Sequence, residues 1–388
     1  MATRRDFLAT SAALGCSAAA APFVTPVVLA AAPGKARLVV IILRGGLDGL
    51  DTVAPVGDPG FAALGRSRAE GAGDLGGYFA LHPALAPLLP LWQAGELGFA
   101  HAVATPYRDK RSHFDGQDLL ENGGGRSDGM MTKAEDGWLN RFLSQIGGDD
   151  PEVAFSVGRE QMRLMTGAAA HSSWSPEAAM ALSPQGELLL EYIYRRDPLF
   201  AEAAARAMRL SADVGGASMS PGKAARAEAL AQFAAGRLAA ETRIAAFSLT
   251  GFDTHRNQKA VLSRSLGELA TAITTLKTEL GSVWDSTAVV AMTEFGRTAR
   301  LNGSGGTDHG TGGVMFMAGG AIKGGRILGR WPGLSEADLY QRRDLLPTDD
   351  LRRYMGWLLR DLFGAQASAI ERAVFPGLDM AQNPGLLL

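Results

Sequence analysis

The sequence is almost free of cysteine. Its 388 residues include one, Cys16, and that residue lies in an N-terminal segment that we expect to be removed. The mature chain would then have no disulfide, no cysteine nucleophile and no thiolate metal ligand. A metal site in this chain must therefore use imidazole nitrogens and oxygen donors.

An excess of positive charge is also missing. The chain has 38 Lys and Arg residues against 40 Asp and Glu residues, a formal net charge of −2. Such a balance offers nothing to attract a polyanion, so we expect no nucleic-acid partner. We find no internal repeat, which argues against a solenoid or propeller. With 46% hydrophobic residues, the chain has ample material for a large core.

The N-terminus has the pattern of a twin-arginine export signal. Arg4 and Arg5 precede a stretch of small and apolar residues that extends to Ala32. The alternative is a membrane anchor, but Pro22 and Pro26 interrupt the stretch and it ends in three alanines, which favours cleavage. We therefore expect the twin-arginine translocase as a partner during export, no stable membrane span after cleavage, and a periplasmic or secreted location.

Composition divides the chain into a predicted signal and a predicted domain that contains a distinct middle section. Residues 1–32 form the predicted signal, and residues 33–388 form a predicted α/β domain. Within that domain, residues from about 125 to 240 are mostly alanine-rich with helical patterning, interrupted by a Ser/Gly-rich linker. This middle section is a candidate helical cap or insertion.

The apolar run Leu38–Leu43 is the first strand of the predicted domain. Its Val and Ile residues are typical of a strand buried on both faces of a parallel sheet. Two glycines, Gly45 and Gly46, allow a tight turn after it. Similar reasoning predicts a mainly parallel central sheet flanked by helices, with further strands at Glu96–Val103, Val153–Val157, Ile244–Leu249, Thr287–Met292 and Val314–Ala318, and helices at His82–Gln93, Ser112–Glu121, Trp138–Ile146, Gln258–Leu280 and Thr348–Phe363.

Three of the predicted strands lead into polar segments that carry a carboxylate, and two histidines lie beside carboxylates. Loops beyond the carboxyl ends of strands are where open α/β sheets bind ligands. Each short motif by itself fits a turn or a helix cap equally well, but their recurrence favours a site for a divalent ion, namely Zn, Mn, Mg or Ca. The candidate ligands are Asp48, Asp253, His255, Glu294, Asp308 and His309.

Ser112 stands where a helix N-cap is expected and is a candidate nucleophile. The positive end of a helix dipole favours an anion there, and a nearby metal ion makes a hydroxyl more nucleophilic. Arg111 and Arg297 are candidates for holding the oxygens of that anion. The alternative is that Ser112 is simply an N-cap. His113 directly follows it, and its role stays open.

Five segments occur in an order that resembles a known family. LRGGLDGLD, RSHFDGQD, GFDTH, MTEFGRT and GGTDHG together resemble the exported bacterial family called domain-of-unknown-function family 1501, from about Lys35 to near the C-terminus. That family is similar in fold to the alkaline phosphatase and sulfatase superfamily. The superfamily has a mainly parallel central sheet flanked by helices. Its members use metal ions and a Ser, Thr or formylglycine nucleophile on phosphate or sulfate esters.

The resemblance implies a role for each matching residue. Ser112 would be the nucleophile at the start of a helix. The metal ligands would be Asp48 after the first strand, the pair Asp253 and His255, Glu294 in place of an Asp-His pair, and His309 together with Asp308.

This sequence departs from the superfamily at two points. A two-zinc site there normally has three histidines, whereas His255 and His309 are the two in matching places. A single ion, a pair of other metals and a site without catalysis all stay open. The chain also lacks a Cys/Ser-x-Pro-x-Arg sequence, so the nucleophile motif of formylglycine sulfatases is absent from it.

Two functions follow from the sequence. The first is an exported metal-dependent hydrolase that acts on a small anionic substrate, a phosphate- or sulfate-type ester, through Ser112. The second is an inactive relative of such enzymes that serves as a periplasmic binding or assembly protein.

Overall fold

The computed structural model describes most of the chain outside its N-terminus and part of its middle section. The described residues are 27–30, 35–108, 110–127, 130–131, 136–146, 162–169, 172–174, 223–240 and 242–388. Most of the predicted signal and the predicted strand at Val153–Val157 lie outside them. Val27–Ala30, at the end of the predicted signal range, is described as a strand.

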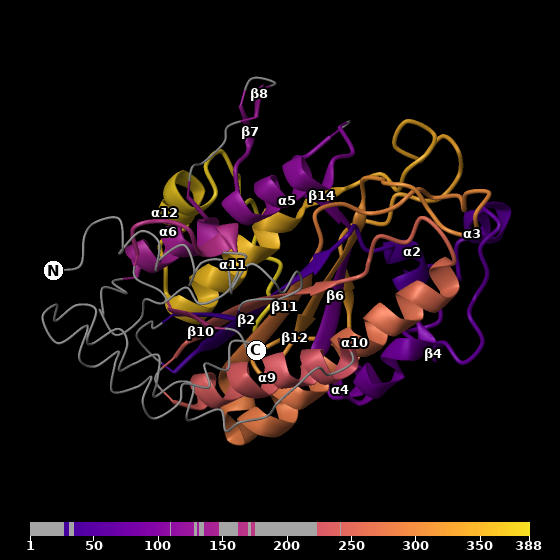
Figure 1. The fold of residues 1–388 in the computed structure, drawn as a ribbon. Coiled ribbons are helices and arrows are strands. Elements are labelled where there is room, and N and C mark those ends of the chain that lie inside the picture. Colours follow the sequence, from indigo (N-terminus) through magenta and orange to yellow (C-terminus); the bar gives the residue numbers. More distant parts are fainter. Residues whose placement is uncertain are drawn as a thin grey trace, which may run out of the picture.

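A mixed sheet forms the centre of the molecule (Figure 1). Its strands, in spatial order, are β13 (Ile327–Leu328), β6 (Leu97–Ala104), β12 (Gly313–Ala318), β11 (Thr287–Met292), β2 (Arg37–Arg44), β10 (Ile244–Thr250), β1 (Val27–Ala30) and β9 (Ser172–Trp174), and β14 (Asp349–Asp350) also pairs with β6. Two smaller sheets contain β3 (Val53–Ala54), β5 (Ala80–Leu81) and β4 (Gly73–Asp74), and β7 (Arg126–Ser127) and β8 (Met130–Met131).

The three central strands are parallel. In their register Val39 of β2 lies opposite Ala245 of β10 on one side and Val289 of β11 on the other. By contrast, β12 runs antiparallel to β11 and to β6. The carboxyl ends of β2, β10 and β11 and the amino end of β12 therefore meet at the same edge of the sheet.

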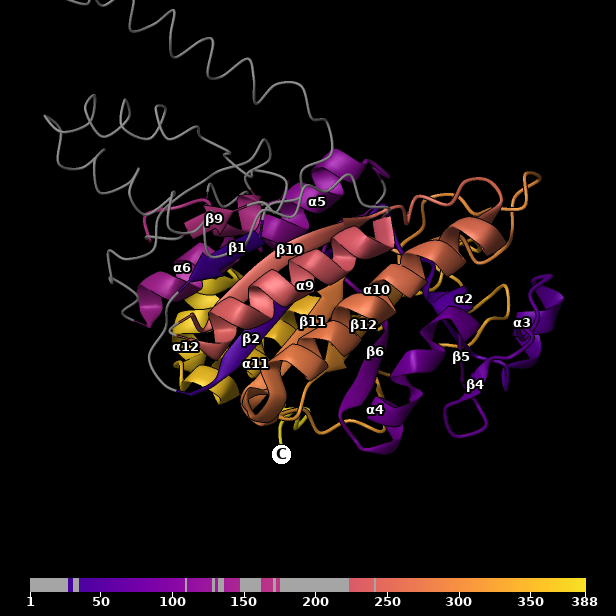
Figure 2. The same cartoon turned by 60° about the horizontal axis from the view of Figure 1, so that its bottom comes forward.

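Helices cover both faces of the sheet. On one face lie η1 (Pro83–Leu88), α4 (Leu89–Gln93), α9 (Lys223–Ala239) and α10 (Gln258–Leu280), with α9 and α10 side by side (Figure 2). On the other lie α5 (His113–Asn122), α6 (Trp138–Gln145), α11 (Leu351–Phe363) and η4 (Ile370–Val374). Short helices in the connections are α2 (Gly49–Thr52), α3 (Pro59–Ala63), η2 (Arg163–Met165), η3 (Gly281–Ser286) and α12 (Ala367–Ala369).

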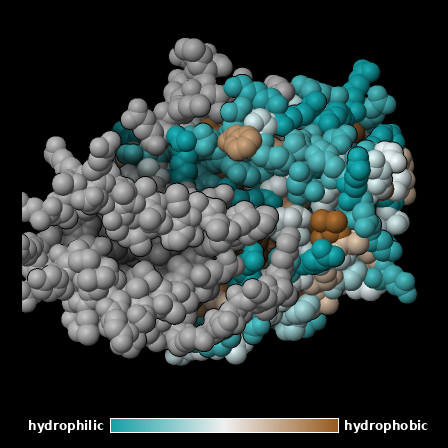
Figure 3. Space-filling view, viewed as in Figure 1, coloured by the Kyte–Doolittle hydropathy of each residue, from teal (hydrophilic) through white to brown (hydrophobic). Residues whose placement is uncertain are grey.

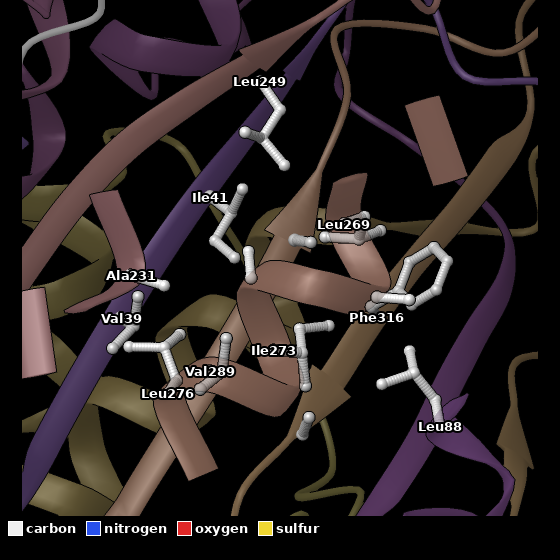
Figure 4. Close-up of a cluster of buried hydrophobic side chains, with 14 of the residues drawn as sticks. Val39, Ile41, Leu88, Ala231, Leu249, Leu269, Ile273, Leu276, Val289 and Phe316 are labelled. Carbon is white, nitrogen blue, oxygen red and sulfur yellow. The ribbon is translucent and has the colours of Figure 1, made fainter. Parts of the chain in front are cut away.

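Strand β2 contributes to both cores because its side chains alternate. Val39 and Ile41 belong to the cluster under α9 and α10 (Figure 4). Val40 and Ile42 belong to the cluster on the opposite face. A strand with an apolar layer on each side needs an unbroken apolar sequence, and this explains the run that the sequence shows.

The predicted α/β class, with its sheet flanked by helices, is confirmed, and α10 and β11 have the predicted bounds. The range His82–Gln93 divides into η1 and α4, as its prolines lead one to expect, because Pro87 and Pro90 cannot donate the hydrogen bonds of a continuous α-helix. The C-terminal helix begins at Leu351 rather than three residues earlier, because the Asp350 carboxylate caps it by accepting the Arg352 N–H at 2.9 Å.

The candidate cap at about 125–240 lies largely outside the described residues. Its described C-terminal part, α9, packs against α10 and the central sheet. The buried residues of α9 recur at intervals of three and four, as on one face of a helix, and they are Ala227, Leu230, Ala231, Ala234, Ala235 and Leu238.

The surface of the described part is mostly hydrophilic in the view of Figure 3. Large exposed hydrophobic side chains there include Tyr78, Phe114 and Leu301, on separate segments of the chain. No helix in the described ranges has the length and apolar character that a membrane crossing requires.

Truncation of Ile273 tests the packing of α10 on the sheet. This side chain is 0% exposed in the core of that face, so Ile273→Ala should lower the free energy of unfolding by about 2–5 kcal/mol. The exposed Thr278 on the same helix supplies the control, and Thr278→Ala should change stability by roughly 0.5 kcal/mol or less. Denaturant titration of both variants measures the difference, and equal stabilities would contradict this packing.

Candidate metal centre

Three histidines and one aspartate converge at the carboxyl edge of the central strands. Asp253 and His255 lie on the loop after β10, His309 precedes β12, and His113 is the first residue of α5. Ligand atoms of His113, Asp253 and His309 all lie within 4.8 Å of one another. Residues from distant parts of the sequence thus form one compact group of metal-binding side chains.

Four of the separations between donor atoms are close to those of ligands on one ion. His255 Nε2 lies 2.9 Å from His309 Nε2 and 3.1 Å from Asp253 Oδ1. His309 Nε2 to Asp253 Oδ1 and His113 Nε2 to Asp253 Oδ2 are each 3.5 Å. Donors about 2.0–2.1 Å from a tetrahedral zinc ion lie about 3.3 Å apart. The observed separations bracket this value.

Each histidine uses its other nitrogen to contact an acceptor outside the group. His309 Nδ1 donates to the Arg111 carbonyl at 2.8 Å. His113 Nδ1 donates to Glu294 Oε1 at 2.8 Å, and His255 Nδ1 donates to Asp308 at 3.2 Å. Carbonyl and carboxylate oxygens only accept, so each Nδ1 carries a hydrogen and each Nε2 faces the centre. This is the usual orientation of metal-binding histidines.

Without a positive charge, this arrangement is repulsive. Facing lone pairs and a carboxylate require either protons or a cation among them. The hydrogen bonds to Asp253 and then to Glu294 raise the pKa of His113 to about 9. Partial burial raises the pKa of Asp253, but hydrogen bonds from His113, His309 and Arg297 outweigh it and hold that pKa far below its usual range. The centre therefore strongly favours a positive charge.

The Nε2 atom of His113 also points to a ligand. It is buried, and its 3.5 Å contact with Asp253 Oδ2 is long for a hydrogen bond, although Glu294 fixes the ring. A buried polar atom without a close partner is costly. A metal ion between His113 and Asp253 would satisfy it.

Glu294, a predicted ligand, lies behind His113. Its Oε1 accepts from His113, from the Gly45 N–H at 2.9 Å and from Gln117 at 3.1 Å, and its Oε2 accepts from Thr293 at 3.0 Å. Burial raises the pKa of Glu294, but these hydrogen bonds outweigh burial and lower it. With both oxygens occupied, Glu294 orients a ligand rather than acting as one.

Arg297, predicted to hold a substrate anion, is buried under the group. Its guanidinium donates to Asp253 Oδ1 at 2.5 Å. It also donates to four backbone carbonyls, so that it contacts three segments in all; the carbonyls are those of Gly45, Gly46, Phe252 and Thr307. Its contacts join the loops that carry the ligands, so the geometry gives Arg297 a positioning role.

Asp48 is the predicted ligand that the structure does not bring to the three histidines. It is buried and forms an ion pair with Arg66 at 2.9 Å and accepts from Gln258 at 2.7 Å. Burial raises the pKa of Asp48, but the Arg66 charge and these hydrogen bonds outweigh it and lower the pKa. Asp48 also caps α2 by accepting the Asp51 N–H. Its contacts support the fold around the loops.

Asp308, another predicted ligand, is an outer partner of the centre. Its Oδ1 accepts from His255 Nδ1 and, at 3.1 Å, from the Asn302 amide. The same amide donates to the His255 carbonyl at 3.0 Å. Asp308 and Asn302 together therefore fix the orientation of the His255 ring.

Ser112 caps α5 directly before His113, as predicted. Its Oγ accepts the Asp115 N–H at a long 3.4 Å, and no other hydrogen bond of this oxygen is found in the described part of the chain. The hydroxyl is thus only weakly engaged and adjoins the candidate ligands.

Arg111 has an unusual backbone conformation. Its φ of 53° is left-handed, which costs a residue other than glycine roughly 1–2 kcal/mol. This conformation accompanies the contact of its carbonyl with His309. The side chain is exposed.

His113 is the ligand that sequence reasoning left open. The local signal for it was its place at the start of a helix, directly after Ser112. Its convergence with Asp253 depends on the docking of α5 against the loop after β10, which local sequence does not show.

Removal of the Arg297 guanidinium should destabilise the protein. Arg297→Met leaves buried carbonyls and Asp253 without their donor, and we expect a loss of about 3–5 kcal/mol in the free energy of unfolding. Exposed Arg300, which contacts one carbonyl at 3.2 Å, gives the control Arg300→Met, with little change expected. Denaturant unfolding compares the two, and a shared small effect would rule out the proposed positioning role.

Comparison with known proteins identifies a family. The family model described as "Protein of unknown function (DUF1501)" matches residues 98–373, a range that includes the three histidines, Asp253, Glu294 and Arg297 but not Asp48. Neither the curated proteins nor the solved structures include a match to the chain. Since the matched range spans more than half of the sequence, the chain belongs to the DUF1501 family.

Proposed function

We propose that this protein is a metal-dependent hydrolase with one divalent ion bound by His113, Asp253, His255 and His309. The observation that carries the proposal is the convergence of three Nε2 atoms on a carboxylate while every Nδ1 contacts an outer acceptor. Three imidazoles and one carboxylate suit Zn or Mn better than Mg or Ca, which prefer oxygen ligands.

The side chains around the centre suit an anionic ester. A divalent ion bound there would act as a Lewis acid on a phosphate or sulfate group and lower the pKa of a nearby hydroxyl. Ser112 Oγ would attack the phosphorus or sulfur atom, and the bond to the ester oxygen would break to release an alcohol. Water would then hydrolyse the seryl ester and restore the serine hydroxyl.

The location that accompanies this function is outside the cytoplasm. The twin-arginine pattern at Arg4 and Arg5 supports export to the periplasm or beyond. An export route that accepts folded proteins is compatible with a metal ion bound before transport.

A second candidate is a binding or assembly protein without turnover. Four protein donors complete a tetrahedral shell, and closed shells are typical of structural zinc. The Asp253 side chain is 46% exposed, and this favours the hydrolase over the binding protein, because an accessible ligand leaves the ion open to a substrate.

Replacement of a histidine tests the metal centre. Purified wild-type protein should bind about one equivalent of zinc or manganese, and His113→Ala should bind at least roughly tenfold more weakly, since even outer partners contribute 10- to 100-fold. His82, a cap residue of η1, gives the control His82→Asn, which should bind like the wild type. Elemental analysis measures the content. Wild-type protein that binds neither metal would overturn the proposal.

Replacement of Ser112 tests the nucleophile. Ser112→Ala and Ser112→Asn should each lose hydrolysis of 4-nitrophenyl phosphate or sulfate, by on the order of 10³-fold in kcat, with metal content unchanged. Asn restores an N-cap but has no hydroxyl, so it separates chemistry from helix stability. Full turnover by Ser112→Asn would exclude Ser112 and leave water as the nucleophile.

A further inference from the structure

We propose that the substrate carries a second anionic group, and that this group binds in a notch beside His309. The proposal rests on the proposed function, because it assumes that the first anionic group lies at the metal centre. The notch would make Arg111 a specificity-determining residue. The substrate would then be an ester that carries an additional carboxylate or a similar oxygen anion.

The notch is lined by residues that favour an anion. Its lining consists of Tyr107, Arg108, Arg111, Gly310, Thr311 and Tyr340, which include two arginines and no acidic residue. Its volume of about 10 Å³ has room for about one water-sized group. It therefore suits an oxygen of an end group and is too small for an apolar ring.

The two arginines differ in how they are held. The Arg108 guanidinium donates to the carbonyls of Thr105 and Tyr107, which fixes its position. Arg111 is exposed, and within the described residues its guanidinium has no acceptor. One fixed and one available guanidinium provide a preorganised charge and a donor for a new carboxylate.

The backbone links the notch to the metal centre. Arg111 lines the notch, and its carbonyl accepts from His309 Nδ1. Gly310, another lining residue, directly follows His309. A substrate bound to the ion beside His309 would therefore extend naturally toward Arg111.

One buried carboxylate, that of Asp344, contacts the lining of the notch. Asp344 is buried, pairs with Arg343 at 2.7 Å and accepts from the Thr311 hydroxyl at 2.9 Å. Arg343 also donates to the His309 carbonyl at 2.9 Å. The charge of Arg111 also acts on Asp344, but no hydrogen bond joins the two within the described residues, so the Arg111 guanidinium keeps its donors for a ligand.

The test compares two phosphonates that differ by one carboxylate. Zinc-loaded protein is titrated calorimetrically with 3-phosphonopropionate and with propylphosphonate, and the first should bind at least about tenfold more tightly. Arg111→Gly should abolish this preference. Glycine suits the φ of 53°, so the carbonyl contact with His309 and the zinc content should persist.

Two further variants separate the notch from general electrostatics. Lys110→Ala removes a neighbouring exposed charge outside the lining and should keep the full preference. Arg111→Lys keeps the charge without the planar fork and should retain part of it. Loss of the preference in Lys110→Ala, or its full retention in Arg111→Gly, would overturn the proposal.

The outcomes also separate this inference from the proposed function. Equal binding of both phosphonates to wild-type protein, dependent on zinc, would reject the notch and keep the metal centre. Absence of zinc-dependent binding by either phosphonate would reject the anion-binding function itself. The wild-type comparison does not depend on the folding of any variant.

Discussion

The buried Arg297 guanidinium is the interaction on which the arrangement of the centre depends. It joins Asp253 and the carbonyls of segments that follow β2, follow β10 and precede β12. Loops with a high glycine content have much conformational entropy to lose, and one planar group with five donors fixes several of them together. The arginine thus offsets the cost of bringing these loops close, and it also holds Asp253 ionised.

The outer partners of the histidines give the centre its electrostatic character. Glu294, Asp308 and the Arg111 carbonyl orient the rings so that their Nε2 atoms face a carboxylate. Such a group is unfavourable until a cation neutralises it, and stored repulsion of this kind is typical of functional sites. The left-handed backbone of Arg111 belongs to the same arrangement, since its carbonyl accepts from His309 and the residue lines the notch.

Sheet topology explains why these residues meet. The parallel strands β10 and β2 place the loops that follow them at one edge, as the rule for open α/β sheets predicts. His309 reaches the same edge because β12 is antiparallel, so the segment before it lies where the loops after its neighbours lie. A purely parallel sheet would place His309 at the opposite end.

Local sequence by itself determined the elements and several of their end residues. The periodicity of apolar side chains predicts the strand β2 and the bounds of α10. A hydrogen bond between near neighbours explains the cap at Ser112. Asp253, His255 and His309 were also predicted from local motifs. Tertiary structure alone decided which polar groups pair: Asp48 with Arg66, Glu294 with His113, Arg297 with four carbonyls. These partners come from different segments, and the choice among acceptors depends on how helices and loops dock, which no local pattern records.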